Sequence, residues 1–365
     1  MTPSLVVVPR NRNCAIDLLR IVSAVFIVML HTLSQGGVLS SLGNLTFEAE
    51  AMWLFQIIFY CGVNVFALVS GYIGFGGRHK SNGIISLWFS LAFYSVLSVS
   101  LSVLFNFEEF SFMSLLKALI PVGNNWYFNA YFALFFFMPL IDRVVDSVDR
   151  GLLKRAIVVC AILFMIVESV SSVKEFGVNV GYSAVWLSIL YFIGAYMKKY
   201  NPFEKLGMSK CIVGLVVCVI ITFVLRIAIE LVMLKVKGVA QGGTKFISYT
   251  SPLIVMQAVF VLEIFSRLKI TKGVKFITFV SQTTFGVFII HTSDFVYRYL
   301  LFGSLSFVAG HSLLYALGVS IGCGMLIFAG SALIDITRAF LFKYLRISKL
   351  AVFLGNKLDS LFGKL

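Results

Sequence analysis

The chain has 365 residues, of which 59% are hydrophobic and 13% are charged, and its formal net charge at pH 7 is +14. Soluble domains average roughly 45–50% apolar and 25% charged residues, so no water-soluble fold of this length could hide so much apolar surface. The composition therefore excludes a soluble globular protein and predicts an all-α membrane protein.

Apolar stretches long enough to cross a bilayer recur along the chain. A spanning helix needs roughly 20 mainly apolar residues. This criterion predicts about ten spans, at residues 15–34, 52–75, 84–106, 125–141, 155–171, 183–198, 211–232, 250–266, 276–293 and 313–334. The segment 112–122 is expected to be re-entrant or interfacial. We expect residues 1–335 to form one membrane domain and residues 336–365 to form an amphipathic cytoplasmic tail.

The first apolar stretch resembles a signal peptide because Arg10 and Arg12 precede it. However, Asp17, Arg20 and His31 interrupt it, and no small-residue cleavage pattern follows. These features favour an uncleaved first transmembrane helix.

The distribution of the 30 Lys and Arg residues predicts the orientation of the chain. Cytoplasmic loops of membrane proteins carry an excess of basic residues. With the N-terminus inside, most Lys and Arg fall on the cytoplasmic side, and both termini are cytoplasmic. Basic residues that alternate with apolar runs are typical of membrane loops, so we expect membrane lipid as a partner and no nucleic acid.

The six cysteines lie mostly in apolar segments and have no disulfide or zinc spacing. We expect them to be free thiols that pack as small hydrophobic side chains, and we expect no metal site.

Ionisable groups inside spanning helices are costly and are candidates for function. Arg20 and His31 are eleven residues apart, so they share one helix face with roughly 20° of offset and roughly 16 Å of separation. Asp17 lies one turn before Arg20 and can pair with it. We interpret His31 as the strongest candidate, since an imidazole deep in an apolar helix needs polar partners. The alternatives are an orienting Asp17–Arg20 ion pair and a structural histidine.

A second histidine lies at a comparable depth. His291 is near the outer end of the ninth predicted span, and both it and His31 lie roughly 9–11 Å outward of their helix midpoints. The two histidines are therefore compatible with one polar site.

Four segments together resemble the acyltransferase-3 family, in the order in which that family has them. They are Ile16-Asp17-Leu18-Leu19-Arg20 followed by His31, Gly62-Val63-Asn64-Val65-Phe66 with Ser70-Gly71-Tyr72, Asn125-Trp126-Tyr127-Phe128 followed by Pro139-Leu140, and Ser281 through His291. No single segment is specific, but their shared order is.

This resemblance implies a ten-helix enzyme of the bacterial plasma (inner) membrane. It would move an acyl group, usually acetyl, from cytoplasmic acyl-coenzyme A to a hydroxyl of a cell-surface or lipid-linked glycan. His31 would be the catalytic base or a transient acyl carrier, which agrees with the ability of imidazole to accept a proton near neutral pH. Arg20 would bind the donor, because a guanidinium suits phosphate groups.

Other site residues follow from the same resemblance. Members often carry two arginines after the second helix, whereas here the segment reads Arg78-His79-Lys80. Arg78 and Lys80 are expected to contact coenzyme A phosphates or to anchor the loop. The expected lining residues are Asp17, Asn64, Trp126, Tyr127 and His291. We also expect a channel that opens beside Arg20 and narrows toward His31.

Two other functions remain as alternatives. One is a transporter or flippase for surface polysaccharide, although such proteins usually show internal repeats and interrupted spans in matching halves. The other is a binding scaffold, which would not explain histidines deep in apolar helices.

Overall fold

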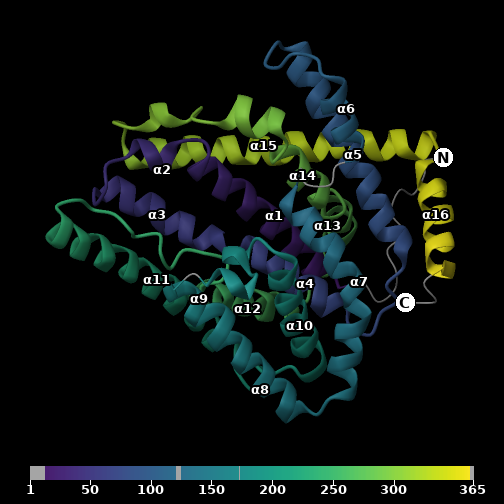
Figure 1. Cartoon of the computed structure of the whole chain (residues 1–365). Helices are drawn as coiled ribbons and strands as arrows, with labels where there is room; N and C mark the ends of the chain where they lie inside the picture. The colour runs from purple at the N-terminus through teal and green to yellow at the C-terminus, as the bar shows by residue number, and fades with distance from the viewer. Residues whose placement is uncertain (1–12, 121–124, 172, 362–365) are drawn as a thin grey trace.

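The structure is a computed structural model that describes residues 13–120, 125–171 and 173–361, apart from the side chain of Lys174 (Figure 1). Within these residues every regular element is helical, which confirms the all-α prediction. The basic residues Arg10, Arg12 and Lys364 lie outside the described residues.

The helices follow one another closely along the chain. They are α1 (Cys14–Ser34), α2 (Val38–Ser41), α3 (Phe47–Tyr60), α4 (Gly62–Gly74), α5 (Ser81–Leu104), α6 (Phe112–Leu119), α7 (Trp126–Ser147), α8 (Arg150–Cys160), η1 (Ala161–Val167), α9 (Glu168–Ser171), η2 (Lys174–Phe176), η3 (Asn179–Gly181), α10 (Ala184–Tyr200), α11 (Met208–Lys237), α12 (Pro252–Ser266), α13 (Val274–Ser281), α14 (Thr284–His291), η4 (Phe295–Leu301), η5 (Ser306–Val308), α15 (Leu313–Tyr344) and α16 (Ile347–Leu361).

Each of the ten predicted spans coincides with helical structure. Seven segments among the described residues are long and apolar enough to cross a membrane: Cys14–Ser41, Phe47–Gly74, Ser81–Leu104, Trp126–Ser147, Met208–Lys237, Val274–His291 and Leu313–Tyr344. The helix at 150–171 is divided by a π-helical stretch, and α10 and α12 are shorter than 18 residues. The chain is therefore a multi-pass membrane protein, whereas the count of ten and the orientation of the termini stay predictions.

Helix α1 is central in the bundle (Figure 1). It begins at Asn13, whose side chain accepts hydrogen bonds from the backbone N–H groups of Ala15 at 3.0 Å and Ile16 at 3.4 Å. Along its length it contacts α3, α4, α12, α13, α14 and α15. Because neighbours surround α1, its polar side chains face other helices rather than lipid.

Two spans are interrupted. The first breaks between α3 and α4 at Cys61, and the second between α13 and α14 at Gln282 and Thr283. Helix α4 packs closely on α10, since a Cβ on Gly71 would lie only 2.0 Å from the carbonyl oxygen of Tyr191. Small residues at such contacts let membrane helices approach one another.

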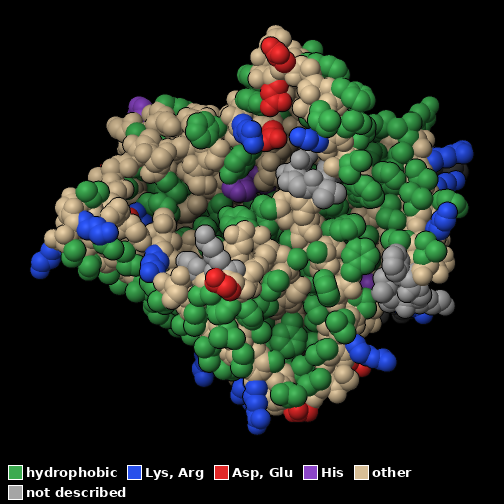
Figure 2. All heavy atoms as spheres, viewed as in Figure 1, with side chains coloured by type: hydrophobic (Ala, Val, Ile, Leu, Met, Phe, Trp, Pro, Cys, Tyr) green, Lys and Arg blue, Asp and Glu red, His purple; other side chains and the backbone are tan. Residues whose placement is uncertain are grey.

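Much of the visible face is apolar, with charged side chains gathered mainly toward its edges (Figure 2). On α11, Val213, Ile220, Val224 and Val232 are all more than half exposed. Exposed apolar surface of this extent is typical of contact with lipid.

The boundary predicted at residue 335 lies within a helix, and so does most of the segment predicted to be interfacial. Helix α15 runs through residue 335 without a break and ends at Tyr344. The following helix α16 packs on α5, where the Asp359 carboxylate accepts a hydrogen bond from the backbone N–H of Ser81 at 3.2 Å. The predicted interfacial segment contains α6, which projects from the bundle (Figure 1) and exposes Phe112 and Met113. The placement of α6 and α16 at membrane surfaces stays a prediction.

Candidate functional site

The two histidines predicted to share a site are in direct contact. His31 lies near the end of α1 and His291 is the last residue of α14. Nδ1 of His31 lies 3.0 Å from Nε2 of His291. The other ring nitrogen of His291, Nδ1, lies 2.7 Å from the carbonyl oxygen of Val287.

These contacts fix the protonation pattern of the pair. A carbonyl oxygen can only accept, so Nδ1 of His291 carries a hydrogen and donates it to Val287. In a neutral imidazole the other nitrogen is then an acceptor, so Nδ1 of His31 donates to Nε2 of His291. As a result, Nε2 of His31 is left with its lone pair available. The hydrogen-bond network thus presents one unprotonated nitrogen of His31 for chemistry.

His31 faces a cavity of about 230 Å³ with mainly aromatic walls. The aromatic residues on its walls are Trp126, Tyr182, Tyr249, Phe288 and Tyr297. The ring of Tyr297 meets the ring of His31 edge-on, with 5.3 Å between their centroids. The ring centroids of Trp126 and Tyr182 are 4.6 Å apart. The imidazole therefore lies beside a space of substrate size, and it is neither sealed by packing nor directed only at lipid.

The N-terminus of α7 helps to form this cavity. Asn125 is the N-cap of α7, because its side-chain oxygen accepts from the backbone N–H of Phe128 at 3.0 Å. The Asn125 side-chain nitrogen donates to Oγ1 of Thr292 at 3.3 Å. One residue thus begins α7, places Trp126 at the cavity and connects α7 to the end of α14.

Two phenols of the cavity belong to loops rather than helices. Tyr182 follows η3, and Tyr249 lies in the loop before α12. Burial raises the pKa of both Tyr182 and Tyr249 above the ordinary value, and the proximity of Tyr182 adds to the rise for Tyr249. Both side chains are therefore neutral near pH 7, and their hydroxyl groups can form hydrogen bonds with each other and with a bound hydroxyl compound.

Arg20 lines a second cavity, of about 280 Å³. Its Nη1 lies 3.7 Å from Oδ1 of Asp17, and the other carboxylate oxygen of Asp17 accepts from the hydroxyl of Thr278 at 3.3 Å. The Asp17 side chain is only 3% exposed, whereas that of Arg20 is 33% exposed. The buried Asp17 carboxylate thus orients the Arg20 guanidinium, which faces the cavity.

The expected channel from Arg20 to His31 is divided in two. Tyr127 lines the Arg20 cavity and Phe288 lines the His31 cavity. Their rings are in edge-to-face contact, 5.3 Å apart between centroids. This aromatic pair lies between the two spaces and separates them.

Five expected site residues line neither of these two cavities: Asp17, Asn64, Arg78, Lys80 and His291. Asp17 contacts Arg20 and His291 contacts His31, so both support lining residues instead of lining a cavity themselves. Asn64 is fully buried behind the wall of the His31 cavity. Its Nδ2 donates to the carbonyl oxygen of Tyr249 at 2.8 Å, and its Oδ1 accepts from Nε1 of Trp186 at 3.2 Å. Asn64 therefore supports the Tyr249 loop instead of lining the site. Arg78 and Lys80 are exposed on the connection between α4 and α5.

Some residues of this region were missed by sequence reasoning. Tyr131 lines the Arg20 cavity, and Tyr182, Tyr249 and Tyr297 line the His31 cavity. A tyrosine in an apolar or loop segment has no distinguishing spacing, so no signal in the sequence singles out these four.

Comparisons with known proteins identify the family of the chain. Residues 13–335 match the family model described as an acyltransferase domain, and this range covers most of the chain. No match was found among curated proteins or among solved structures.

Proposed function

Because the chain belongs to the acyltransferase-3 family, we propose that it is a membrane O-acyltransferase that moves an acetyl group from acyl-coenzyme A to a glycan hydroxyl. The acceptor would be a cell-surface or lipid-linked sugar, and the location would be a bacterial plasma membrane. The observation that carries the proposal is the His31–His291 pair, which leaves Nε2 of His31 unprotonated beside an aromatic cavity.

The pair supports general-base chemistry. Nε2 of His31 removes the proton of the acceptor hydroxyl as that oxygen attacks the thioester carbonyl. The tetrahedral intermediate then collapses, the carbon–sulfur bond breaks, and the departing thiolate takes the proton from His31. Because Nδ1–H of His31 donates to His291, the positive charge that develops on His31 is stabilised and the ring stays oriented.

The same tautomer also suits a transient acyl carrier. In that route Nε2 of His31 attacks the thioester carbonyl itself and the thiolate leaves. The acceptor hydroxyl then displaces the imidazole from the acyl group, and its proton passes to the thiolate. Both routes need the lone pair at Nε2, so His31 is the catalytic residue in either.

The aromatic walls support a sugar as the acceptor. Trp126, Tyr182 and Tyr249 offer ring faces for the apolar C–H face of a pyranose, and the two phenols can donate hydrogen bonds to its hydroxyls. Arg20 supports entry of the anionic donor at the opposite end of α1. Donor and acceptor would then approach from opposite faces of the membrane.

Mass spectrometry of surface glycans provides the test. Cells that carry the gene should show acyl mass increments on a surface glycan, and cells with the His31→Ala variant should lack them. Identical glycans in both strains would contradict the proposal. Binding of acetyl-coenzyme A to the purified protein separates the enzyme from a polysaccharide transporter, which has no use for the donor.

A further inference from the structure

A third cavity lies between the break in the α13–α14 span and helix α15. It has a volume of about 250 Å³, and its polar lining comes from Gln282, Thr283, Asp335, Arg338 and Lys343. Arg338 and Lys343 lie beyond residue 335, where the family match ends. The family relationship therefore assigns no role to these two cations.

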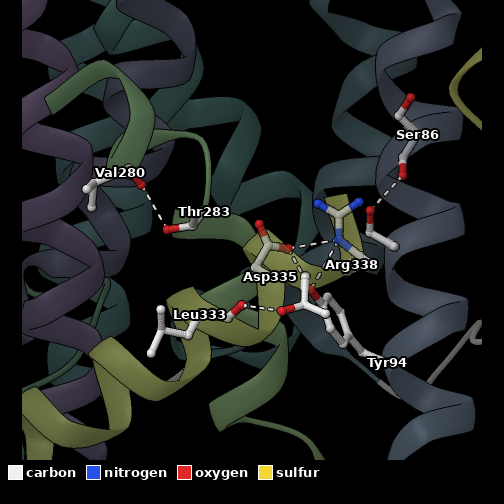
Figure 3. Close-up of polar contacts among 9 residues, drawn as sticks. Ser86, Tyr94, Val280, Thr283, Leu333, Asp335 and Arg338 are labelled. Carbon is white, nitrogen blue, oxygen red and sulfur yellow. Dashed lines mark hydrogen bonds and ion pairs between the residues drawn. The ribbon is translucent and has the colours of Figure 1, made fainter. Parts of the chain in front are cut away.

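Arg338 is held so that part of its guanidinium group stays available. Its Nε donates to Oδ1 of Asp335 at 2.9 Å and to the hydroxyl of Tyr94 at 3.1 Å, and that hydroxyl donates to Asp335 at 2.6 Å. In Figure 3 the dashed lines from Arg338 to Asp335 and Tyr94 leave from Nε, and none leaves from the two terminal nitrogens. Neither has a partner among the described residues.

The carboxylate that anchors Arg338 is itself fixed. Asp335 is 3% exposed and lies against α14 at Gly286, where a Cβ would be only 2.1 Å from Oδ1 of the carboxylate. With Asp335 fixed, the plane of the Arg338 guanidinium is fixed as well, and its flat face is covered by the ring of Phe342 at 4.8 Å. A guanidinium oriented in this way is suited to an oxyanion.

The charges around the cavity favour an anion. The Arg338 side chain is only 15% exposed, so most of it lies inside the protein, and it lines the cavity. Asp335 is the one acidic residue of the cavity wall and it pairs with Arg338, so the cation of Lys343 has no compensating charge among the described residues that line the cavity. A group with several anionic oxygens would satisfy both cations.

The cavity also adjoins the Arg20 cavity. Gln282 lines both, and it is the residue at which α13 ends. A ligand with a phosphate group in the α15 cavity could therefore extend past Gln282 to Arg20. Acyl-coenzyme A is such a ligand, with a phosphate-bearing nucleotide at one end and a slender thioester arm at the other.

We propose that the cavity lined by Arg338 and Lys343 is a phosphate-binding site, and that it holds the nucleotide end of the acyl donor. This inference rests on the proposed acyltransferase function. An anionic lipid headgroup offers the same chemistry, so the experiment must distinguish the two sources of phosphate.

The test measures binding of adenosine 3′,5′-bisphosphate, the nucleotide end of the donor without its arm, and the KM for acetyl-coenzyme A. The protein is placed in nanodiscs of phosphatidylcholine, a zwitterionic lipid with no net charge. We expect Lys343→Gln and Arg338→Lys to weaken nucleotide binding by roughly ten-fold and to raise the donor KM to a similar extent, with little change in kcat. Arg338→Lys keeps a cation beside Asp335, so the fold is preserved. Lys349→Gln, at an exposed position on α16, is the matched control and should bind normally.

Two outcomes would overturn the inference. The first is nucleotide binding and donor KM in both variants equal to those of the wild-type protein. The second is an effect that appears only when anionic lipid is added to the nanodiscs, which would assign the site to a lipid headgroup. If the wild-type protein neither binds nor consumes acetyl-coenzyme A, the proposed function itself fails. If the wild-type protein turns over normally and both variants match it, only the phosphate-binding site is contradicted.

Discussion

Nδ1 of His31 lies 3.0 Å from Nε2 of His291, although 260 residues separate the two histidines in the chain. The contact joins the C-terminal part of α1 to the end of α14. Because His291 also donates to its own helix backbone, the two imidazoles have different roles. His31 presents the free nitrogen, and His291 positions it.

His31→Ala should abolish acyl transfer while leaving membrane insertion and expression intact. Loss of a general base typically costs 10²- to 10⁴-fold in rate, and loss of an acyl carrier would cost at least as much. The measurement is the rate of acyl transfer by purified protein at saturating donor. His311→Ala is the control, because His311 is exposed near the start of α15. Full transfer by the His31→Ala protein would remove the central assignment.

His291→Ala should lower kcat by roughly 10- to 100-fold with little change in the donor KM, since the ring of His31 loses its acceptor but the Arg20 cavity is untouched. His291→Gln should recover part of this loss, because its side-chain oxygen can accept from Nδ1–H of His31. Steady-state kinetics of the two variants make the comparison. Equal activity of the Ala and Gln variants would contradict the positioning role.

The sequence predicted both histidines because each is an ionisable group within an apolar helix, where function is the common reason for its presence. It also predicted the Asp17–Arg20 pair, which the structure forms at 3.7 Å. Such features depend on helix geometry alone, and a helical repeat can be read from a single sequence.

The remainder of the site depends on tertiary contacts. Tyr249 reaches the cavity because Asn64, 185 residues earlier, binds its backbone carbonyl group. No local pattern predicts such a loop position. The prediction that Asn64 lines the cavity was wrong for a related reason. An amide in an apolar helix suggests a polar site, and the sequence does not show that Tyr249 and Trp186 are its buried partners.

Arg20→Lys should weaken activity less than Arg20→Ala, and both losses should appear mainly in the donor KM. Lysine keeps the positive charge but lacks the planar group that binds phosphate with two hydrogen bonds. The experiment compares donor KM values for the two variants in nanodiscs. Because Arg20→Ala also removes a partner of the buried Asp17, its thermal stability must be measured in parallel. Normal donor dependence in both variants would leave Arg20 as an orientation anchor.

Gly286→Ala should destabilise the protein and reduce transfer, because a methyl group at this position would lie 2.1 Å from the Asp335 carboxylate. Relieving that clash requires α14 to move away from α15, and His291 lies five residues further along α14. Overpacking of this kind typically costs about 1–3 kcal/mol. The midpoint of thermal unfolding and the transfer rate are the measurements. Gly318→Ala is the control, since nothing lies within 4 Å of its added methyl group, and equal effects at the two glycines would contradict the close packing of α14 on α15.

Phe288→Leu should increase hydrolysis of acetyl-coenzyme A in the absence of acceptor. The edge-to-face contact of Phe288 with Tyr127 lies between the Arg20 cavity and the His31 cavity, so we expect it to keep water of the His31 cavity away from the thioester until the donor arm passes between the two rings. Leucine remains apolar but lacks the ring, and the two spaces should then communicate. We expect the rate of donor hydrolysis to rise several-fold while the ratio of transfer to hydrolysis falls.

Release of coenzyme A thiol, followed with and without acceptor, measures both rates in one assay. Phe276→Leu is the matched control, because that ring is 71% exposed on α13 and contacts neither cavity. The unfolding midpoint of each variant shows whether the core has been preserved, since Phe288 itself is buried. A stable Phe288→Leu protein with the hydrolysis rate of the wild type would mean that the aromatic pair is not the barrier. The donor arm would then have to reach His31 by another path between α1, α7 and α14.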